Sequence, residues 1–182
     1  MINLSKYKSI VFDCDGVILN SNKIKTNAFR IATKDFGPKA SMALEKYHLV
    51  NGGVSRYKKF DYFLTSILHI DCDEEKKFFK NKLIKIYSEE TKNALLTCEV
   101  SFGLNKIRDK MKNISWSIVS GGDQNQLRYI FKKRNMDYLF DGGIYGSPDE
   151  KNWIISNNLI KGNLELPALY IGDSELDHKV AK

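Results

Sequence analysis

The amino-acid sequence predicts an α/β protein, with a parallel sheet and an all-helical block inserted into it. The first observation is a set of short apolar runs bounded by polar residues, each typical of a buried strand: 10–12, 115–119 and 168–171. The second is that helical periodicity separates the later runs, an alternation that predicts right-handed crossovers between parallel strands. The third is a long stretch without any strand signal after the first run.

That stretch runs from Ser21 to Thr97, and its apolar residues recur at helical spacing. Ser55 is a plausible N-cap, and acidic residues favour the first turn of a helix. The helices expected here are 21–36, 39–49, one that follows Ser55 and one that opens with the acids 73–75. The sequence thus predicts a discontinuous core and an inserted helical domain, with these bounds: 1–20 and 98–182 for the core, 21–97 for the insertion.

Beyond residue 97 the pattern alternates between helix and strand. The expected helices are 102–111, 124–134 and 149–158. The expected strands are 115–119, ending at Ser120-Gly121-Gly122, a short strand within 140–145 that Gly142-Gly143 interrupts, and 168–171. Open α/β sheets bind ligands at the carboxyl ends of such strands, so polar residues there are the first candidates for a site.

The composition excludes several classes of protein. A chain of 182 residues with 42% hydrophobic residues and 3 Pro is typical of a globular fold. No apolar run approaches the ~20 residues that cross a bilayer, and residues 1–8 lack the apolar stretch of a signal peptide. Cys14, Cys72 and Cys98 have no CxxC spacing, which argues against a disulfide framework or a zinc site. We therefore expect a cytoplasmic protein without a membrane partner.

Positive charge is concentrated in the helical block. Residues 21–97 hold 15 Lys and Arg against 9 Asp and Glu, a net +6 within a total of +7. Such a segment can attract nucleic acid, an anionic membrane or a small phosphorylated substrate, or it can simply place lysines on solvated helix faces. Because no basic stripe interleaved with aromatic residues is present, nucleic acid is not expected as a partner.

Two carboxylates, Asp13 and Asp15, come directly after the first strand, and Gly16 follows them. Side chains alternate along extended backbone, so both acids point to one side and Cys14 points to the other, into the packing. Gly16 permits a sharp turn because it tolerates φ values that other residues avoid. An Asp-x-Asp pair is common by itself, so its meaning depends on partners elsewhere in the chain.

Such partners follow the later strands. Ser120 and Gly121 offer a hydroxyl and uncrowded N–H groups suited to a phosphate, and Lys151 lies in the first turn of a helix, an unusual place for a cation unless it faces an anion. Asp173 and Asp177 flank a turn after the last strand, and four carboxylates would suit Mg²⁺. Each residue also has an ordinary alternative: a turn serine, a solvated lysine, a helix cap.

The order of these residues is more specific than any one of them. It reads Asp13-x-Asp15-Gly16-Val17, Ser120-Gly121, Lys151 and Gly172-Asp173-Ser174-x-x-Asp177. This order resembles the haloacid dehalogenase-like (HAD) superfamily, in the branch of phosphoglycolate phosphatase and β-phosphoglucomutase. The resemblance covers the whole chain and implies a Rossmann-like catalytic core with a helical cap domain inserted after the first motif.

The resemblance also implies roles. Asp13 would be the nucleophile that forms an aspartyl-phosphate, and Asp15 the general acid and then the base. Ser120, the Gly121 N–H and Lys151 would bind the transferring phosphoryl group. The implied Mg²⁺ ligands are Asp13, the backbone carbonyl of Asp15, Asp173 and, directly or through the outer sphere, Asp177. The presence of an acid at Asp15 favours phosphoryl transfer over dehalogenation in this superfamily.

The helical block adds substrate-binding candidates. Gly53-Val54-Ser55-Arg56 resembles the specificity loop of the branch, in which the Arg reaches a distal anionic group of a small phosphorylated substrate. Lys25 occupies the position at which β-phosphoglucomutases carry a His that helps transfer protons. The sequence therefore favours a Mg²⁺-dependent phosphatase for a sugar phosphate or phospho-acid over a sugar phosphomutase.

The end of the chain is the main departure from the family. Members of the family usually continue with the rest of a helix and a final strand, whereas this sequence ends at Lys182. A C-terminal edge strand is therefore expected to be missing, and a truncated, inactive paralogue that only binds a phosphorylated ligand stays a third alternative. The sequence gives no indication of an oligomeric state.

Overall fold

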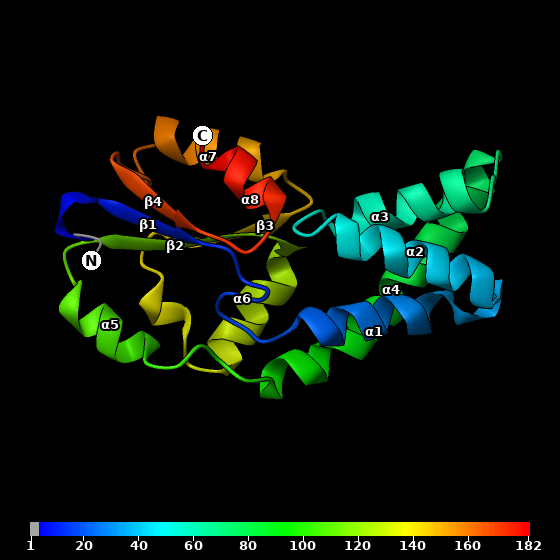
Figure 1. Ribbon diagram of the computed structural model, residues 1–182, viewed down its shortest axis with the longest axis horizontal. Helices are drawn as coiled ribbons and strands as arrows, with labels where there is room; N and C mark the ends of the chain where they lie inside the picture. Colours follow the sequence, from blue (N-terminus) through cyan, green and yellow to red (C-terminus); the bar gives the residue numbers. More distant parts are fainter. Residues whose placement is uncertain (1–3) are drawn as a thin grey trace.

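The computed structural model describes residues 4–182, which form two lobes (Figure 1). One lobe holds the sheet and both ends of the described chain, and the other consists of helices α1–α4. Within residues 4–182, every helix is either too short or too polar to cross a bilayer.

The sheet has four parallel strands in the order β3-β2-β1-β4. Their bounds are β1 Ser9–Phe12, β2 Ser115–Asp123, β3 Gly143–Ser147 and β4 Ala168–Ile171. This sheet confirms the predicted α/β class. The central strand β1 is buried along its full length, because it has a neighbouring strand on each side and helices over both faces. Asp13 and Asp15, which follow it, therefore lie at the middle of the sheet's carboxyl edge.

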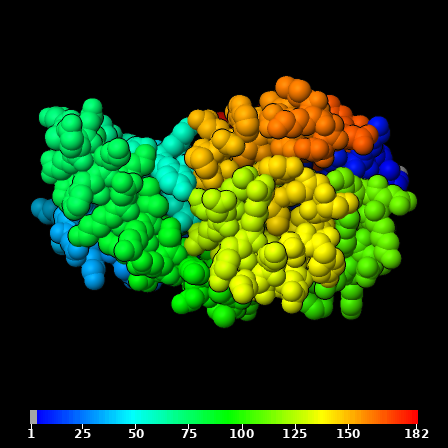
Figure 2. Space-filling view, turned by 180° about the vertical axis from the view of Figure 1, so that it is seen from behind, coloured from blue at the N-terminus to red at the C-terminus, as the bar shows by residue number. Residues whose placement is uncertain are grey.

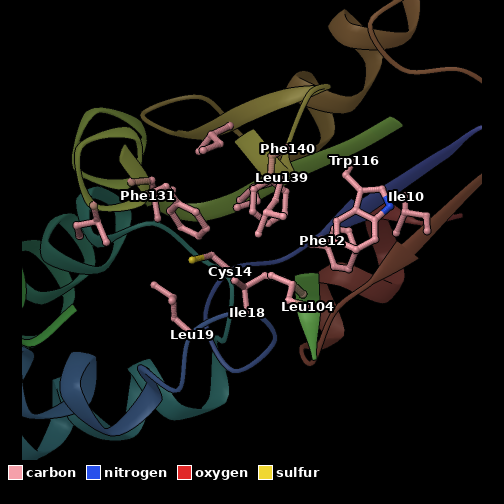
Figure 3. Close-up of a cluster of buried hydrophobic side chains, with 14 of the residues drawn as sticks. Ile10, Phe12, Cys14, Ile18, Leu19, Leu104, Trp116, Phe131, Leu139 and Phe140 are labelled. Carbon is pink, nitrogen blue, oxygen red and sulfur yellow. The ribbon is translucent and has the colours of Figure 1, made fainter. Parts of the chain in front are cut away.

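Helices cover both faces of the sheet (Figure 1). Their bounds are α5 Leu104–Lys110 and α6 Gln124–Lys133 on one face, and α7 Lys151–Ile160 and α8 Glu175–Val180 on the other. The larger hydrophobic cluster contains the rings of Phe12, Trp116 and Phe140, with 4.8 Å between the ring centroids of Phe12 and Trp116 (Figure 3). Cys14 is fully buried in this cluster, as the alternation of side chains predicts.

The second lobe has a hydrophobic core of its own. It contains Phe29, Leu44, Phe60, Leu83 and Tyr87, among others. The helices are α1 Asn22–Thr33, α2 Pro38–Val50, α3 Arg56–Tyr62, which continues as a π-helical turn Phe63–Ile67, and α4 Asp73–Thr97. A separate core explains how this all-helical segment can be inserted between β1 and β2 without disturbing the sheet.

Two strand boundaries differ from the prediction. Strand β2 does not end at Ser120 but continues through Gly121 and Gly122, with an irregular register against β3 between Val119 and Asp123. The glycines interrupt the regular pairing without ending the strand, because backbone lacking a side chain tolerates a bulge. The third strand lies at Gly143–Ser147, so it begins at the glycines that were expected to interrupt it.

The two lobes touch along α3 and α6 and at the start of α7. Arg56 and Tyr57 of α3 donate hydrogen bonds to Gln126 and Asp123, and Lys58 forms an ion pair with Glu150 at 2.6 Å. Figure 2 shows this contact from behind, where the cyan segment near residue 55 meets the orange start of α7. Three consecutive residues of α3 thus join the helical lobe to three positions of the core.

Candidate active site

A cavity of about 350 Å³ lies between the carboxyl edge of the sheet and the helical lobe. The core contributes acids to its wall, namely Asp13, Asp15, Asp173 and Glu175. The helical lobe contributes cations, namely Lys25, Arg56 and Lys59. The cavity is therefore divided by charge, with carboxylates on one side and ammonium and guanidinium groups on the other.

Asp13 lies on the core side, and its N–H donates to the carbonyl of Ile171 at 2.8 Å. Its carboxylate is almost fully buried and accepts a hydrogen bond from Lys151 Nζ at 2.8 Å. Burial raises the pKa of Asp13, and nearby Asp15 and Asp177 add to this effect, so that the pKa reaches about 6 although Lys151 opposes the shift. A carboxylate in this position requires positive charge to stay ionised.

Lys151 begins α7 and holds two carboxylates together. Its Nζ lies 2.8 Å from Asp13 Oδ1 and 2.5 Å from Asp177 Oδ1, and the side chain is buried. Burial alone would lower the pKa of the ammonium, but Asp13 and Asp177 outweigh burial and raise it. The unusual placement of a cation in the first turn of a helix is explained because the side chain faces two anions.

Asp173 and Asp177 complete an acidic cluster with Asp13. One carboxylate oxygen from each of these residues lies within 4.8 Å of the others. Gly16 makes room for this cluster: its φ is +76°, and a Cβ there would lie 2.0 Å from Asp173 Oδ2. Three carboxylate oxygens this close together are suitable ligands for Mg²⁺, a hard cation that prefers oxygen donors.

Asp177 is the most constrained member of the cluster. Its Oδ1 accepts from Lys151 and from the Tyr170 hydroxyl at 2.9 Å, and its Oδ2 accepts from the Ser174 N–H and from the Ser174 hydroxyl at 2.6 Å. Ser174 and Asp177 form a capping box at the start of α8. Helix capping and membership of the acidic cluster are therefore combined in one residue.

Asp15 has partners of its own. Its carboxylate accepts a hydrogen bond from Ser21 Oγ at 2.6 Å and forms an ion pair with Lys25. Burial raises the pKa of Asp15, but Lys25 and Ser21 lower it more, so the net pKa is below its ordinary value. Lys25 is buried as well, and its ammonium lies close to the position of a Cβ on Gly122. In this state of the cavity Asp15 is an ionised carboxylate.

Ser120 and Gly121 lie at the bulged end of β2. Ser120 is fully buried, and its Oγ accepts the N–H of Gly122 at 3.0 Å. Gly121 lines the cavity and lies against the loop between α2 and α3: a Cβ on Gly121 would be 2.0 Å from the carbonyl oxygen of Gly53. The absence of a side chain at Gly121 thus allows the helical lobe to close over the site.

Arg56 lines the cavity but is engaged with protein groups. Its guanidinium donates to Ser88 Oγ at 2.9 Å and to Gln126 Oε1, and it stacks 4.7 Å from the ring centroid of Tyr87. All three partners are neutral, so the charge of Arg56 is not balanced by any of them. The residue is in the place predicted for it, and it also joins the two lobes.

Sequence reasoning missed two residues of the helical wall, Lys59 and His48. Lys59 is buried, and its Nζ lies 2.8 Å from His48 Nδ1. One signal was available: Lys59 follows Arg56 by three residues, so both belong to one face of α3. Nothing in the sequence linked His48 of α2 to that face.

Comparisons with known proteins place this site in context. The family model of haloacid dehalogenase-like hydrolases matches residues 10–182. No curated protein gives a significant sequence match to the chain.

Solved structures show the same fold at low sequence identity. A predicted phosphoglycolate phosphatase from Haemophilus somnus is 19% identical with a TM-score of 0.69, covering 98% of this chain and 82% of that one. A predicted phosphatase from Clostridium acetobutylicum is 18% identical with a TM-score of 0.70, covering 96% and 80%. A β-phosphoglucomutase from Clostridium difficile is 17% identical with a TM-score of 0.68, covering 96% and 81%. Because the family model spans almost the whole chain, the protein belongs to the haloacid dehalogenase-like hydrolases.

Proposed function

We propose that the protein is a Mg²⁺-dependent phosphatase that hydrolyses a small phosphorylated metabolite, a sugar phosphate or a phospho-acid, through an aspartyl-phosphate on Asp13. The observation that carries the proposal is the buried Asp13 carboxylate, which lines the cavity and is held by Lys151. The divided charge of the cavity supports it, because a phosphate ester needs cations around it and a carboxylate nucleophile near phosphorus.

In the first step a carboxylate oxygen of Asp13 attacks phosphorus, and the bond from phosphorus to the ester oxygen breaks. The leaving oxygen takes a proton from Asp15. The incoming phosphoryl group brings negative charge beside Asp15, which raises the pKa of its carboxyl and lets it hold that proton. Lys151 and the Gly121 N–H bind phosphoryl oxygens, and the Ser120 hydroxyl donates to one of them.

In the second step Asp15 accepts a proton from water, and the water oxygen attacks the phosphorus of the aspartyl-phosphate. The bond between phosphorus and Asp13 breaks, so inorganic phosphate leaves and the carboxylate is restored. The same side chain serves as acid and then as base because the two steps move the proton in opposite directions.

The acids on the core wall fit a Mg²⁺ ion. Asp13, Asp173 and the backbone carbonyl of Asp15 would hold it, and Asp177, whose oxygens already accept four hydrogen bonds, would support it from the outer sphere. When bound, the ion neutralises charge on the phosphoryl oxygens and on Asp13.

Phosphate release from a panel of phosphorylated metabolites tests the proposed function. With Mg²⁺ we expect turnover of at least one member, and with a chelator in excess we expect no release, because the charge on the phosphoryl oxygens and on Asp13 is then not neutralised. Mg²⁺ is also expected to raise the melting temperature, since it binds the folded state alone. Absence of release from every member, with a melting temperature indifferent to Mg²⁺, contradicts the proposal.

A sugar phosphomutase is the second candidate, and the fold shared with a β-phosphoglucomutase favours it. Lys25 opposes it, because an ammonium paired with Asp15 replaces the histidine expected in a mutase. The two functions separate in one measurement: a mutase converts a sugar phosphate to its isomer without net release of phosphate.

Replacing Lys25 by Met is expected to shift the alkaline limb of the pH profile of kcat to higher pH, because kcat reports the enzyme–substrate complex, in which Asp15 holds the proton. Lys25 lowers the pKa of Asp15, so its removal raises that pKa, and Asp15 then keeps the proton needed in the first step up to a higher pH. The measurement is a pH–rate profile, with Lys23→Met on the exposed side of α1 as the matched control. An unchanged alkaline limb in Lys25→Met would show that Asp15 is not the group reported by that limb.

A further inference from the structure

The helical wall of the cavity holds a second group of residues that the reaction does not use. Lys59 is buried, lines the cavity, and has His48 as its hydrogen-bonding partner. Within residues 4–182 no carboxylate forms an ion pair with Lys59, although Lys25 in the same wall is paired with Asp15. A buried ammonium without a counter-ion is costly, so such a group points to a negatively charged ligand.

The hydrogen bonds around Lys59 fix its role as a donor. Thr26 donates its hydroxyl hydrogen to the carbonyl of Asn22 at 2.9 Å, so Thr26 Oγ1 accepts from His48 Nε2 at 3.1 Å. His48 therefore carries its proton on Nε2, and its Nδ1 accepts from Lys59 Nζ. Burial, together with Lys59 and Lys25, lowers the pKa of His48 to about 3, in agreement with a neutral acceptor. One N–H of Lys59 is used in this series of hydrogen bonds, and the others remain for a ligand.

Arg56 adds a second cation with neutral partners. Its guanidinium contacts Ser88, Gln126 and the ring of Tyr87, and it lies on the same face of α3 as Lys59. Every acid that lines the cavity comes from the core side, and none comes from residues 21–97. The helical end of the cavity is therefore an anion site built from α2 and α3, separate from Lys151 and the core carboxylates.

We propose that Lys59, positioned by His48, binds a second anionic group of the substrate, a carboxylate or another phosphate, and so selects phosphate esters that carry one. This inference rests on the proposed function, because it assumes that the phosphoryl group lies at Asp13. It assigns the discrimination between substrates to Lys59, whereas the sequence pointed to Arg56, whose guanidinium already joins the lobes. Burial and the neighbouring Lys25 lower the pKa of Lys59 to about 7, so an incoming anion also stabilises its protonated form.

The test compares two probes that differ in one charge. Phosphonoacetate carries a phosphonate and a carboxylate, and phosphonoacetamide replaces the carboxylate by a neutral amide of the same shape. Binding of each to the full chain in the presence of Mg²⁺ is measured by calorimetry, and 2-phosphonoethanesulfonate and methylenebisphosphonate serve as further anionic arms. We expect phosphonoacetate to bind about 10- to 100-fold more tightly than phosphonoacetamide, as for a hydrogen bond to a charged group. If the second group of the substrate is a phosphate, the bisphosphonate takes the place of phosphonoacetate in this comparison. The ratio of the dissociation constant of the amide to that of the dianionic probe is the quantity tested.

Lys59→Met is expected to reduce this ratio to about one, and Lys59→Arg to keep part of it, because Arg retains the charge. Lys58→Met is the matched control, since the exposed Lys58 is one residue away and pairs with Glu150 outside the cavity. His48→Phe is expected to lower the ratio with little effect on the binding of the amide, which a purely structural role would not produce.

The outcomes are distinguishable from those of the proposed function. A ratio of one in the wild type overturns the inference, whether or not any phosphate ester is hydrolysed. A ratio that stays high in a folded Lys59→Met variant overturns it as well. Failure to hydrolyse any phosphate ester, together with a high ratio lost in Lys59→Met, contradicts the phosphatase and leaves the anion site established.

Discussion

Replacing Asp13 by Asn is expected to abolish phosphate release while the protein stays folded. Asn matches the shape of Asp and lacks a nucleophilic carboxylate oxygen, so the aspartyl-phosphate cannot form. We expect kcat to fall by about 10⁴-fold or more, as for the loss of other catalytic nucleophiles. The measurement is phosphate release under single-turnover conditions with the best substrate of the panel. Trapping of the phosphorylated enzyme by acid quench should likewise fail in the variant.

Asp13→Asn is also expected to be more stable than the wild type above pH 6, although it is inactive. In the folded protein the pKa of Asp13 is about 6, against an ordinary value of 3.8, because burial and neighbouring acids disfavour its charged form. The folded state therefore binds the proton more tightly than the unfolded state between these values. In chelator, the Asp13 titration should therefore lower the free energy of unfolding of the wild type relative to that of Asp13→Asn as pH rises from about 4 to about 6, whereas the His48 titration, which acts in the opposite direction, is common to both proteins. Asp13→Asn lacks this titration.

Melting curves in chelator at several pH values provide the control. Asp13→Asn should have nearly the melting temperature of the wild type at pH 4 and a higher melting temperature above pH 6.

An Asp13→Asn variant that releases phosphate at the wild-type rate would show that Asp13 is not the nucleophile. If the wild type itself released no phosphate but bound phosphorylated ligands, the protein would be the binding-only paralogue instead.

Much of the core could be predicted because its signals are local. The apolar run before Asp13 and the run at Ala168–Ile171 are short and bounded by polar residues, so they predict strands without reference to the rest of the chain. The end of β2 was predicted wrongly, because Gly121 and Gly122 are typical of turns. Their pairing with β3 is a tertiary contact that no local signal reports.

In the candidate site too, some contacts could be predicted from the sequence and others could not. Asp13, Lys151 and Asp177 lie at strand ends or helix starts, and the carboxyl edge of a parallel sheet brings such positions together, so their meeting follows from topology. Lys59 and His48 meet because α2 packs on α3. The close contact between the backbones of Gly53 and Gly121 depends on how the two lobes pack against each other. These contacts depend on interhelical and interlobe packing, which hydrophobic periodicity does not specify.

Replacing Lys151 by Met is expected to cost both activity and stability. Met retains most of the volume of the side chain and removes the charge that Asp13 and Asp177 share. Two buried carboxylates would then face each other without a cation, a change that typically costs about 3–5 kcal/mol when one partner of a buried pair is removed. Loss of a donor to the phosphoryl oxygens should lower kcat by about 10²- to 10³-fold. Chemical denaturation and steady-state kinetics measure the two effects.

Lys161→Met is the matched control, because Lys161 lies at the other end of α7 and is exposed. A double variant separates electrostatics from packing. If charge repulsion dominates, adding Asp13→Asn to Lys151→Met should recover part of the lost stability, since one of the two unpaired carboxylates is gone. Excess Mg²⁺ should also stabilise Lys151→Met more than it stabilises the wild type, because the acids lack their internal cation. Equal stability of Lys151→Met and wild type in chelator would mean that Lys151 does not balance the buried acids.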